Sequence, residues 1–230
     1  MLSRRMKISG LFILSVGLFL LGCDNSFNLK DVRIDGAIFA TETDAGTFVD
    51  ITQNGAAMYD LSPTINELPV SNQGGSQRYS ISPYALPVDY GREYIFTVTI
   101  KDEAIADTVT LPGAFRFNTA SDTLTTGLYS DGEVTWTRAD SLAKYFAELT
   151  FIDNLGRETI LRQQETGFRT SYTLPNLDAY GEYRLDVYAY HNGIYDPDRG
   201  HLVNYTTPPE WIPSGSLTAW VKHSLYIWVL

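Results

Sequence analysis

Short segments that alternate between apolar and polar residues are the feature that most constrains the fold of this chain. They are rich in Val, Ile, Thr, Tyr and Phe, and turn-forming residues separate them about every 8–12 positions, which is typical of an all-β sandwich. With 44% hydrophobic and 13% aromatic residues, the chain is too apolar to remain disordered. The alternation predicts strands at 32–39, 47–52, 94–100, 106–111, 133–137, 145–152, 158–162 and 182–190.

Two segments of the sequence resemble each other and set the expected number of domains. The sequence YALP at 84–87 precedes Tyr94 and Val98, and the sequence YTLP at 172–175 precedes Tyr183 and Val187. In each copy the tyrosine and the valine have the even spacing that places both on one face of a strand. A separation of roughly 90 residues fits one sandwich per copy. We therefore expect two tandem β-sandwiches, at 31–113 and 114–207.

The N-terminus has the pattern of a segment that is removed from the mature protein. Arg4, Arg5 and Lys7 precede an apolar run of 14 residues at 8–21. Such a run is too short to span a bilayer comfortably and has the length expected of a signal peptide. We therefore expect 1–22 to be a signal peptide. Its removal would take away basic residues only, so the net charge of −10 would become more negative.

The only cysteine of the chain, Cys23, follows this run directly in the sequence Leu20-Leu21-Gly22-Cys23. This sequence resembles the lipobox of bacterial lipoproteins. The resemblance implies that Cys23 carries lipid chains, palmitate among them, that attach the protein to a bacterial membrane, with 23–30 as a lipidated tether. It also implies a place in the cell envelope, at the outer membrane or cell surface or, because Asp24 follows, at the inner membrane. The alternative is an ordinary secretory signal followed by a chance cysteine.

The second repeat carries further residues with a recognisable spacing. Val134 and Trp136 alternate on an early strand, and Leu177 and Tyr183 follow downstream. This pattern resembles the fibronectin type III module, although Asp178 replaces the usual proline. The resemblance implies that Trp136 packs in the core and that the Tyr183 hydroxyl bonds the backbone upstream of it. The first repeat resembles Ig-like sandwiches and also transthyretin-type sandwiches, and the sequence does not distinguish these two alternatives. The two repeats together resemble the two-module lipoproteins of Bacteroidota-type cell envelopes.

The C-terminal segment, 208–230, has a different character. It begins with Pro208-Pro209, and its last 15 residues alternate with apolar side chains on both faces. A strand that is apolar on both faces is usually central and buried. We therefore expect a C-terminal aromatic strand that packs within the fold. The alternative is a segment that orders only on a partner.

Several kinds of chemistry are not supported by the sequence. An acidic chain is a poor partner for phosphate backbones, so no nucleic-acid binding is expected. No motif for a nucleophile, a metal site or a cofactor is present, and His191, His201 and His223 lack the spacing of metal ligands. We therefore predict that the protein is not an enzyme. A pair of facing carboxylates, as in glycoside hydrolases, is the catalytic arrangement left open.

Exposed aromatic side chains are the candidate binding residues. Tyr188 and Tyr190 have the parity opposite to the core residue Tyr183, so we expect them to be exposed with Arg184. The other candidates lie in the C-terminal segment, at Trp211, Trp220 and Trp228.

These observations favour a non-catalytic lipoprotein of the cell envelope that binds a protein or glycan partner through its sandwich modules. One alternative is a carbohydrate-active hydrolase that uses a carboxylate pair. The other is a structural spacer or assembly subunit. Neither the partner nor the oligomeric state follows from the sequence.

Overall fold

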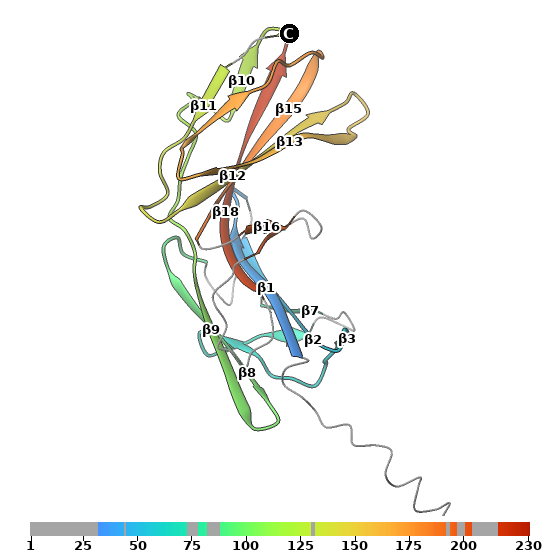
Figure 1. Ribbon diagram of the computed structural model, residues 1–230, viewed down its shortest axis with the longest axis vertical. Helices are drawn as coiled ribbons and strands as arrows, with labels where there is room; N and C mark the ends of the chain where they lie inside the picture. The colour runs from blue at the N-terminus through green and yellow to red at the C-terminus, as the bar shows by residue number, and fades with distance from the viewer. Residues whose placement is uncertain are drawn as a thin grey trace, which may run out of the picture.

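The computed structural model of the chain describes residues 32–43, 45–72, 78–81, 88–129, 132–191, 194–196, 201–203 and 216–230. The predicted signal peptide, the tether with Cys23, and Trp211 lie outside these residues. Every regular element within them is a β-strand, so the predicted all-β fold is confirmed (Figure 1). In the same part of the chain, no helix is long and apolar enough to cross a membrane.

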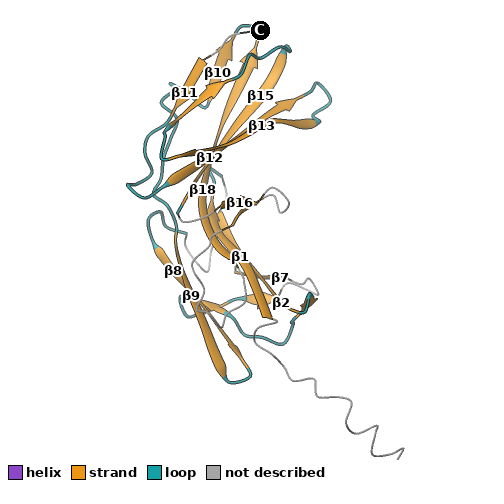
Figure 2. Cartoon of the chain, viewed as in Figure 1, coloured by secondary structure: helices purple, strands orange, loops and turns teal. Residues whose placement is uncertain are grey.

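The largest sheet follows the order β13-β12-β15-β18-β1-β2-β7-β6, with β10 also paired to β18 and β3 to β2. Its strands are β1 (Val32–Ala40), β2 (Ala45–Gln53), β3 (Ala56–Ala57), β6 (Ser71–Asn72), β7 (Arg78–Ile81), β10 (Thr123–Thr126), β12 (Lys144–Ile152), β13 (Glu158–Gly167), β15 (Gly181–Tyr190) and β18 (Ser216–Val229). Figure 2 shows β12, β15, β18, β1 and β2 following one another along the curved molecule.

Three smaller sheets complete the described fold. One has the order β5-β4-β8-β9, one pairs β11 with β14, and one pairs β16 with β17. Their strands are β4 (Thr64–Ile65), β5 (Leu68–Pro69), β8 (Glu93–Ile100), β9 (Glu103–Thr110), β11 (Gly132–Thr135), β14 (Ser171–Leu174), β16 (Ile194–Asp196) and β17 (His201–Val203). Each strand that the alternating pattern predicts is present, with its ends shifted by a few residues.

Two of the smaller sheets, β5-β4-β8-β9 and β11-β14, pack against the large one in a sandwich-like arrangement. Buried residues of β8 and β9, such as Val98, join one hydrophobic cluster with those of β1 and β2, such as Ile51. Trp136, just after β11, joins the same cluster as Leu225 of β18. The core therefore runs through both halves of the fold. The domain limits at 31–113 and 114–207 stay predictions.

Strand β18 belongs to both halves of the large sheet. Its first part pairs in parallel with β1, from Asp35↔Ser216 to Ala40↔Val221. From Trp220 onward it pairs antiparallel with β15, from Gly181↔Val229 to Tyr190↔Trp220, so Trp220 and Val221 pair with both strands. The expected central position of the strand is confirmed. The expectation that both of its faces are buried is only half correct, because Val221 and Leu225 are buried but Tyr226 and Trp228 are 38% and 42% exposed.

Two tyrosines fix the chain just upstream of their own strands. The Tyr183 hydroxyl donates to the carbonyl oxygen of Ala179 over 3.0 Å, which confirms the contact that the fibronectin type III resemblance implies. In the first repeat, the Tyr94 hydroxyl accepts a hydrogen bond of 2.7 Å from the backbone N–H of Asp89. Both rings are buried. The repeated sequence motif therefore builds the same kind of contact twice.

Candidate functional site

Glu42 connects the turn after β1 to the middle of β18. Its Oε1 accepts a hydrogen bond of 2.7 Å from the backbone N–H of Ser224 and lies 3.0 Å from His223 Nδ1. The ring of Phe115 packs on the His223 ring at a centroid distance of 4.8 Å. These contacts join residues from three distant parts of the sequence.

Asp140 makes a second connection, to the segment that follows β9. Its Oδ2 accepts a hydrogen bond of 3.0 Å from the Gly113 N–H and lies 2.9 Å from His191 Nε2. Burial opposes ionisation, but these bonds and further backbone N–H donors hold the pKa of Asp140 below its ordinary value. A Cβ on Gly113 would lie 2.2 Å from the Ala139 carbonyl oxygen, so the backbones approach too closely for any other residue.

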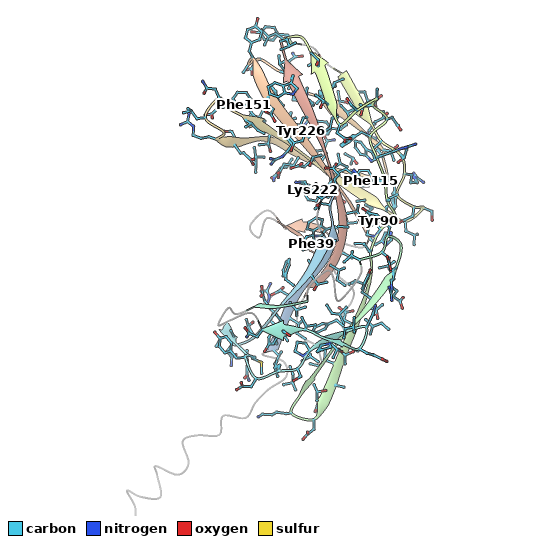
Figure 3. All side chains as sticks on the ribbon, turned by 180° about the vertical axis from the view of Figure 1, so that it is seen from behind. Phe39, Tyr90, Phe115, Phe151, Lys222 and Tyr226 are labelled. Atoms are coloured by element: carbon cyan, nitrogen blue, oxygen red, sulfur yellow. The ribbon has the colours of Figure 1, made fainter. Side chains whose placement is uncertain are left out.

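The face of the large sheet that points away from the core carries most of the candidate binding residues. This outer face consists of the even-numbered residues of β18 and the side chains registered with them on β15, β12, β13 and β1. Figure 3 shows two of them, Phe39 and Lys222, on the inner side of the curved molecule, opposite Phe115 and Tyr90.

Near the middle of the molecule, the aromatic rings of the outer face pack on one another. The ring of Trp220 stacks on Phe39 at 5.0 Å and 16°, and Tyr188 meets Trp220 edge-on at 5.6 Å. A Cβ on Gly46 of β2 would lie 3.0 Å from the Phe39 ring, so Phe39 in turn covers that glycine. Rings stacked in this way stabilise β15, β18, β1 and β2 as one sheet. Because Tyr188, Trp220 and Phe39 are half-buried, little of their faces is open to a ligand.

The expected exposure of Tyr190 is wrong. This side chain is 1% exposed, and its hydroxyl donates to Glu165 Oε1 over 2.7 Å. Burial, together with the bonded Glu165 carboxylate, raises the pKa of the Tyr190 hydroxyl. Parity placed Tyr190 correctly on the outer face, but neighbouring side chains of the sheet cover it. Tyr190 is therefore a packing residue in this structure.

Next to these rings lies a network of ion pairs. Asp186 is buried and accepts hydrogen bonds from Ser224 Oγ at 2.6 Å and from Arg184 Nε at 3.0 Å, with Lys222 Nζ also 3.0 Å away. Arg184 also donates to both oxygens of Glu158, at 2.7 and 2.9 Å. These bonds lower the pKa of Glu158 and raise that of Arg184, against the effect of burial in each case. Arg184 and Lys222 are therefore each paired with a carboxylate.

One group of exposed apolar side chains lies farther along the outer face, at the end of β18. Trp228 is 42% exposed, and on the same side of β18 it is flanked by Tyr226 at 38% and Leu230 at 75%. Tyr180, which precedes β15, is 68% exposed. Glu182 of β15 is the register partner of Trp228. We call these five residues the distal surface, and contiguous exposed apolar groups of this kind mark interaction sites.

Two pairs of carboxylates lie opposite each other on neighbouring strands, Asp35 with Asp50 and Glu148 with Asp186. Asp186 is bound by the donors named above, and Glu148 Oε2 accepts a hydrogen bond of 2.6 Å from Gln163 Nε2. Arg33 Nε pairs with Asp35 at 2.5 Å. In the part of the chain that the structure describes, no group of three or more His, Cys, Asp or Glu residues could hold a metal ion.

The structure divides the predicted site residues into separate groups. Tyr188 and Trp220 lie together in the aromatic stack, Trp228 lies on the distal surface, and Cys23 and Trp211 fall outside the described residues. Glu182 was not singled out from the sequence. That Glu182 and Trp228 lie side by side on one face of the sheet is visible only once the pairing of β15 and β18 is known.

No protein-family model and no curated protein matches the chain. Among solved structures, it is similar to the fibronectin(III)-like modules of Clostridium thermocellum CbhA, with 12% identity, a TM-score of 0.27, and coverage of 86% of this chain and 93% of that one. It is also similar to three N-terminal domains of the bacteriophage RB49 highly immunogenic outer capsid protein, with 11% identity, a TM-score of 0.30, and coverage of 87% and 70%. Neither similarity is strong enough to carry an argument about function.

Proposed function

We propose that the protein is a non-catalytic lipoprotein of the bacterial cell envelope that holds the distal surface away from the membrane for a protein partner. The observation that carries this proposal is the exposure of Trp228, Tyr226 and Leu230 together at one end of β18. Exposed apolar surface is retained at a cost in solubility and is typical of an interface. In Figure 1, this end lies opposite the start of β1, which follows Cys23 closely in the sequence.

The sharing of β18 supports the same proposal. Because one continuous strand pairs with both β1 and β15, the two halves of the large sheet are joined by backbone hydrogen bonds rather than by a flexible linker. The aromatic stack and the contacts of Glu42 add to this connection. The same rigidity is what a structural spacer needs, and the spacer is therefore the second candidate function.

The first test addresses membrane attachment. Replacement Cys23→Ala removes the acylated sulfur, and we expect the protein to move from the membrane fraction to the soluble fraction, because stable attachment depends on the acyl chains. Ser26→Ala, in the same predicted tether, is the matched control and is expected to leave the protein with the membranes. Retention of Cys23→Ala in the membrane fraction at the wild-type level would show that attachment lies elsewhere.

The second test addresses the partner. The soluble form from Asp24 onward is immobilised and incubated with solubilised envelope that is untreated, digested with protease, or oxidised with periodate to destroy glycans. We expect retention of bound material to be lost after protease, to survive periodate, and to fall with Trp228→Leu but not with Tyr90→Leu. Tyr90 is 45% exposed and lies outside the distal surface, so it serves as a matched control.

Two results would contradict the proposal. Binding that survives protease but not periodate would identify a glycan partner. Equal binding by the wild-type protein and the Trp228→Leu variant would place the interface outside the distal surface and favour the spacer.

A further inference from the structure

Trp228 and Glu182 stand side by side on the distal surface. They are register partners on adjacent antiparallel strands, which places their Cβ atoms about 4.5–5.5 Å apart. Ile152 lies on the other side of Glu182, and Thr125 on the other side of Trp228. An indole ring thus adjoins a carboxylate, and the next carboxylate in this row, Glu158, lies beyond Ile152 and is bound by Arg184.

Glu182 differs from the other carboxylates on this part of the sheet. Glu158 is bound by Arg184, and Asp186 is bound by Arg184 and Lys222. Within the described part of the chain, Glu182 has neither a hydrogen-bond nor an ion-pair partner, although it is half-buried. Because no donor in the described part of the chain occupies this carboxylate, it is open to accept hydrogen bonds from a cation of a partner.

We propose that Trp228 and Glu182 form a recognition site for a cationic side chain, an arginine above all, on a basic segment of the protein partner. The inference rests on the proposed function and specifies the chemistry of that partner. A guanidinium can lie over the indole ring while its N–H groups donate to the carboxylate. Its apolar stem then contacts Tyr226 and Leu230, which flank Trp228 on the same face. Arginine suits the site better than lysine because its planar group both stacks and forms two parallel hydrogen bonds.

Charge complementarity favours this partner over a neutral sugar or an anionic ligand. The protein carries a net charge of −10, and the cations beside the distal surface, Arg184 and Lys222, are already engaged by carboxylates. Among the described residues, an anionic group would therefore meet Glu182 and no free cation close to it. A sugar could stack on Trp228, but it would not need the negative charge of Glu182. Whether binding depends on the charge of Glu182 therefore distinguishes a cationic side chain from a neutral sugar.

The test measures binding of two capped peptides to the soluble form by titration calorimetry. One peptide has the sequence Gly-Leu-Arg-Leu-Arg-Gly, and the other has citrulline, which is uncharged and of the same shape, in place of arginine. We expect the citrulline peptide to bind about tenfold more weakly, since an ionic hydrogen bond exceeds a neutral one by roughly 1.4 kcal/mol, the equivalent of tenfold in affinity.

Variants of the protein test whether Glu182 and Trp228 are the residues that bind the peptide. Glu182→Gln keeps the shape of the side chain, and we expect it to weaken binding of the arginine peptide about tenfold while leaving the citrulline peptide unchanged. Trp228→Leu is expected to weaken both peptides. Glu93→Gln, a change of an exposed carboxylate on β8, is the matched control and is expected to bind like the wild-type protein. Thermal unfolding of each variant verifies that it is folded.

Three outcomes would overturn the inference. Equal binding of the arginine peptide by Glu182→Gln and wild type would exclude a role for the carboxylate. If both peptides bound with equal affinity and Trp228→Leu abolished that binding, the distal surface would bind through apolar contacts alone. In that case the proposed function would stand, and the site for a cationic side chain would be excluded. Binding of a neutral hexasaccharide that depends on Trp228 but not on Glu182, with neither peptide bound, would replace the basic segment by a glycan.

Discussion

Removal of 208–230 is expected to abolish folding of the soluble form, because it deletes β18 from the centre of the large sheet. Four large apolar side chains of this strand are at most 2% exposed, namely Val221, Leu225, Ile227 and Val229. Burying such side chains contributes about 1.5–3 kcal/mol each. Their sum is comparable to the roughly 5–15 kcal/mol that separates a folded domain from its unfolded state. The deletion would also leave β1 and β15 with unpaired edges, which favours aggregation.

The measurements are soluble yield, the β-sheet signal in circular dichroism, and resistance to protease. Point variants on the same strand provide the matched comparison. Leu225→Ala, at a fully buried position, is expected to cost about 2–5 kcal/mol of unfolding free energy. Leu230→Ala, at a position that is 75% exposed, is expected to change it by less than about 0.5 kcal/mol. A truncated chain that stays soluble, folded and protease-resistant would show that β18 is dispensable.

The strands themselves could be predicted from the sequence because their signal is local. Alternation with a period of two residues is visible within each segment, and turn residues mark the ends. Asn54 and Gly55 lie between two paired strands and adopt positive φ values of 52° and 79°, which these residue types tolerate.

The pairing of β18 with β1 could not be predicted in the same way. Its partners lie far apart in the sequence, as in the hydrogen bond of 3.2 Å from Thr218 Oγ1 to the Gly36 carbonyl oxygen. Neither segment alone indicates its neighbour. The apolar character of both faces of β18 did indicate a central position, although it did not distinguish the covered face from the exposed one.

The exposure of the candidate site residues could not be predicted from the sequence either. Parity placed Tyr188 and Tyr190 on the strand face opposite to Tyr183, and Trp220 and Trp228 on one face of the C-terminal strand, but it could not say which of these side chains their neighbours cover. Tyr190 is covered and bonded to Glu165, whereas Trp228 stays exposed near the end of its strand. Whether a side chain is open to a partner therefore depends on the three-dimensional packing around it.

Trp136→Ala is expected to lower the unfolding free energy by about 3–5 kcal/mol, because a large cavity would replace a side chain that is 2% exposed. The Trp136 ring meets Tyr145 edge-on at 5.5 Å and Phe117 at 6.2 Å, so its loss removes contacts with both. Its buried Nε1 has no hydrogen-bond partner among the described residues. Trp136→Phe should therefore cost less than Trp136→Ala, since it retains an aromatic ring and removes a donor that is buried without an acceptor. Denaturant titration measures both variants, with Leu230→Ala, at a position that is 75% exposed, as a control for which a change within about 0.5 kcal/mol is expected. A midpoint of Trp136→Ala equal to that of the wild-type protein would mean that this tryptophan does not support the core, and the packing of β11 and β14 on the large sheet would then depend on other residues.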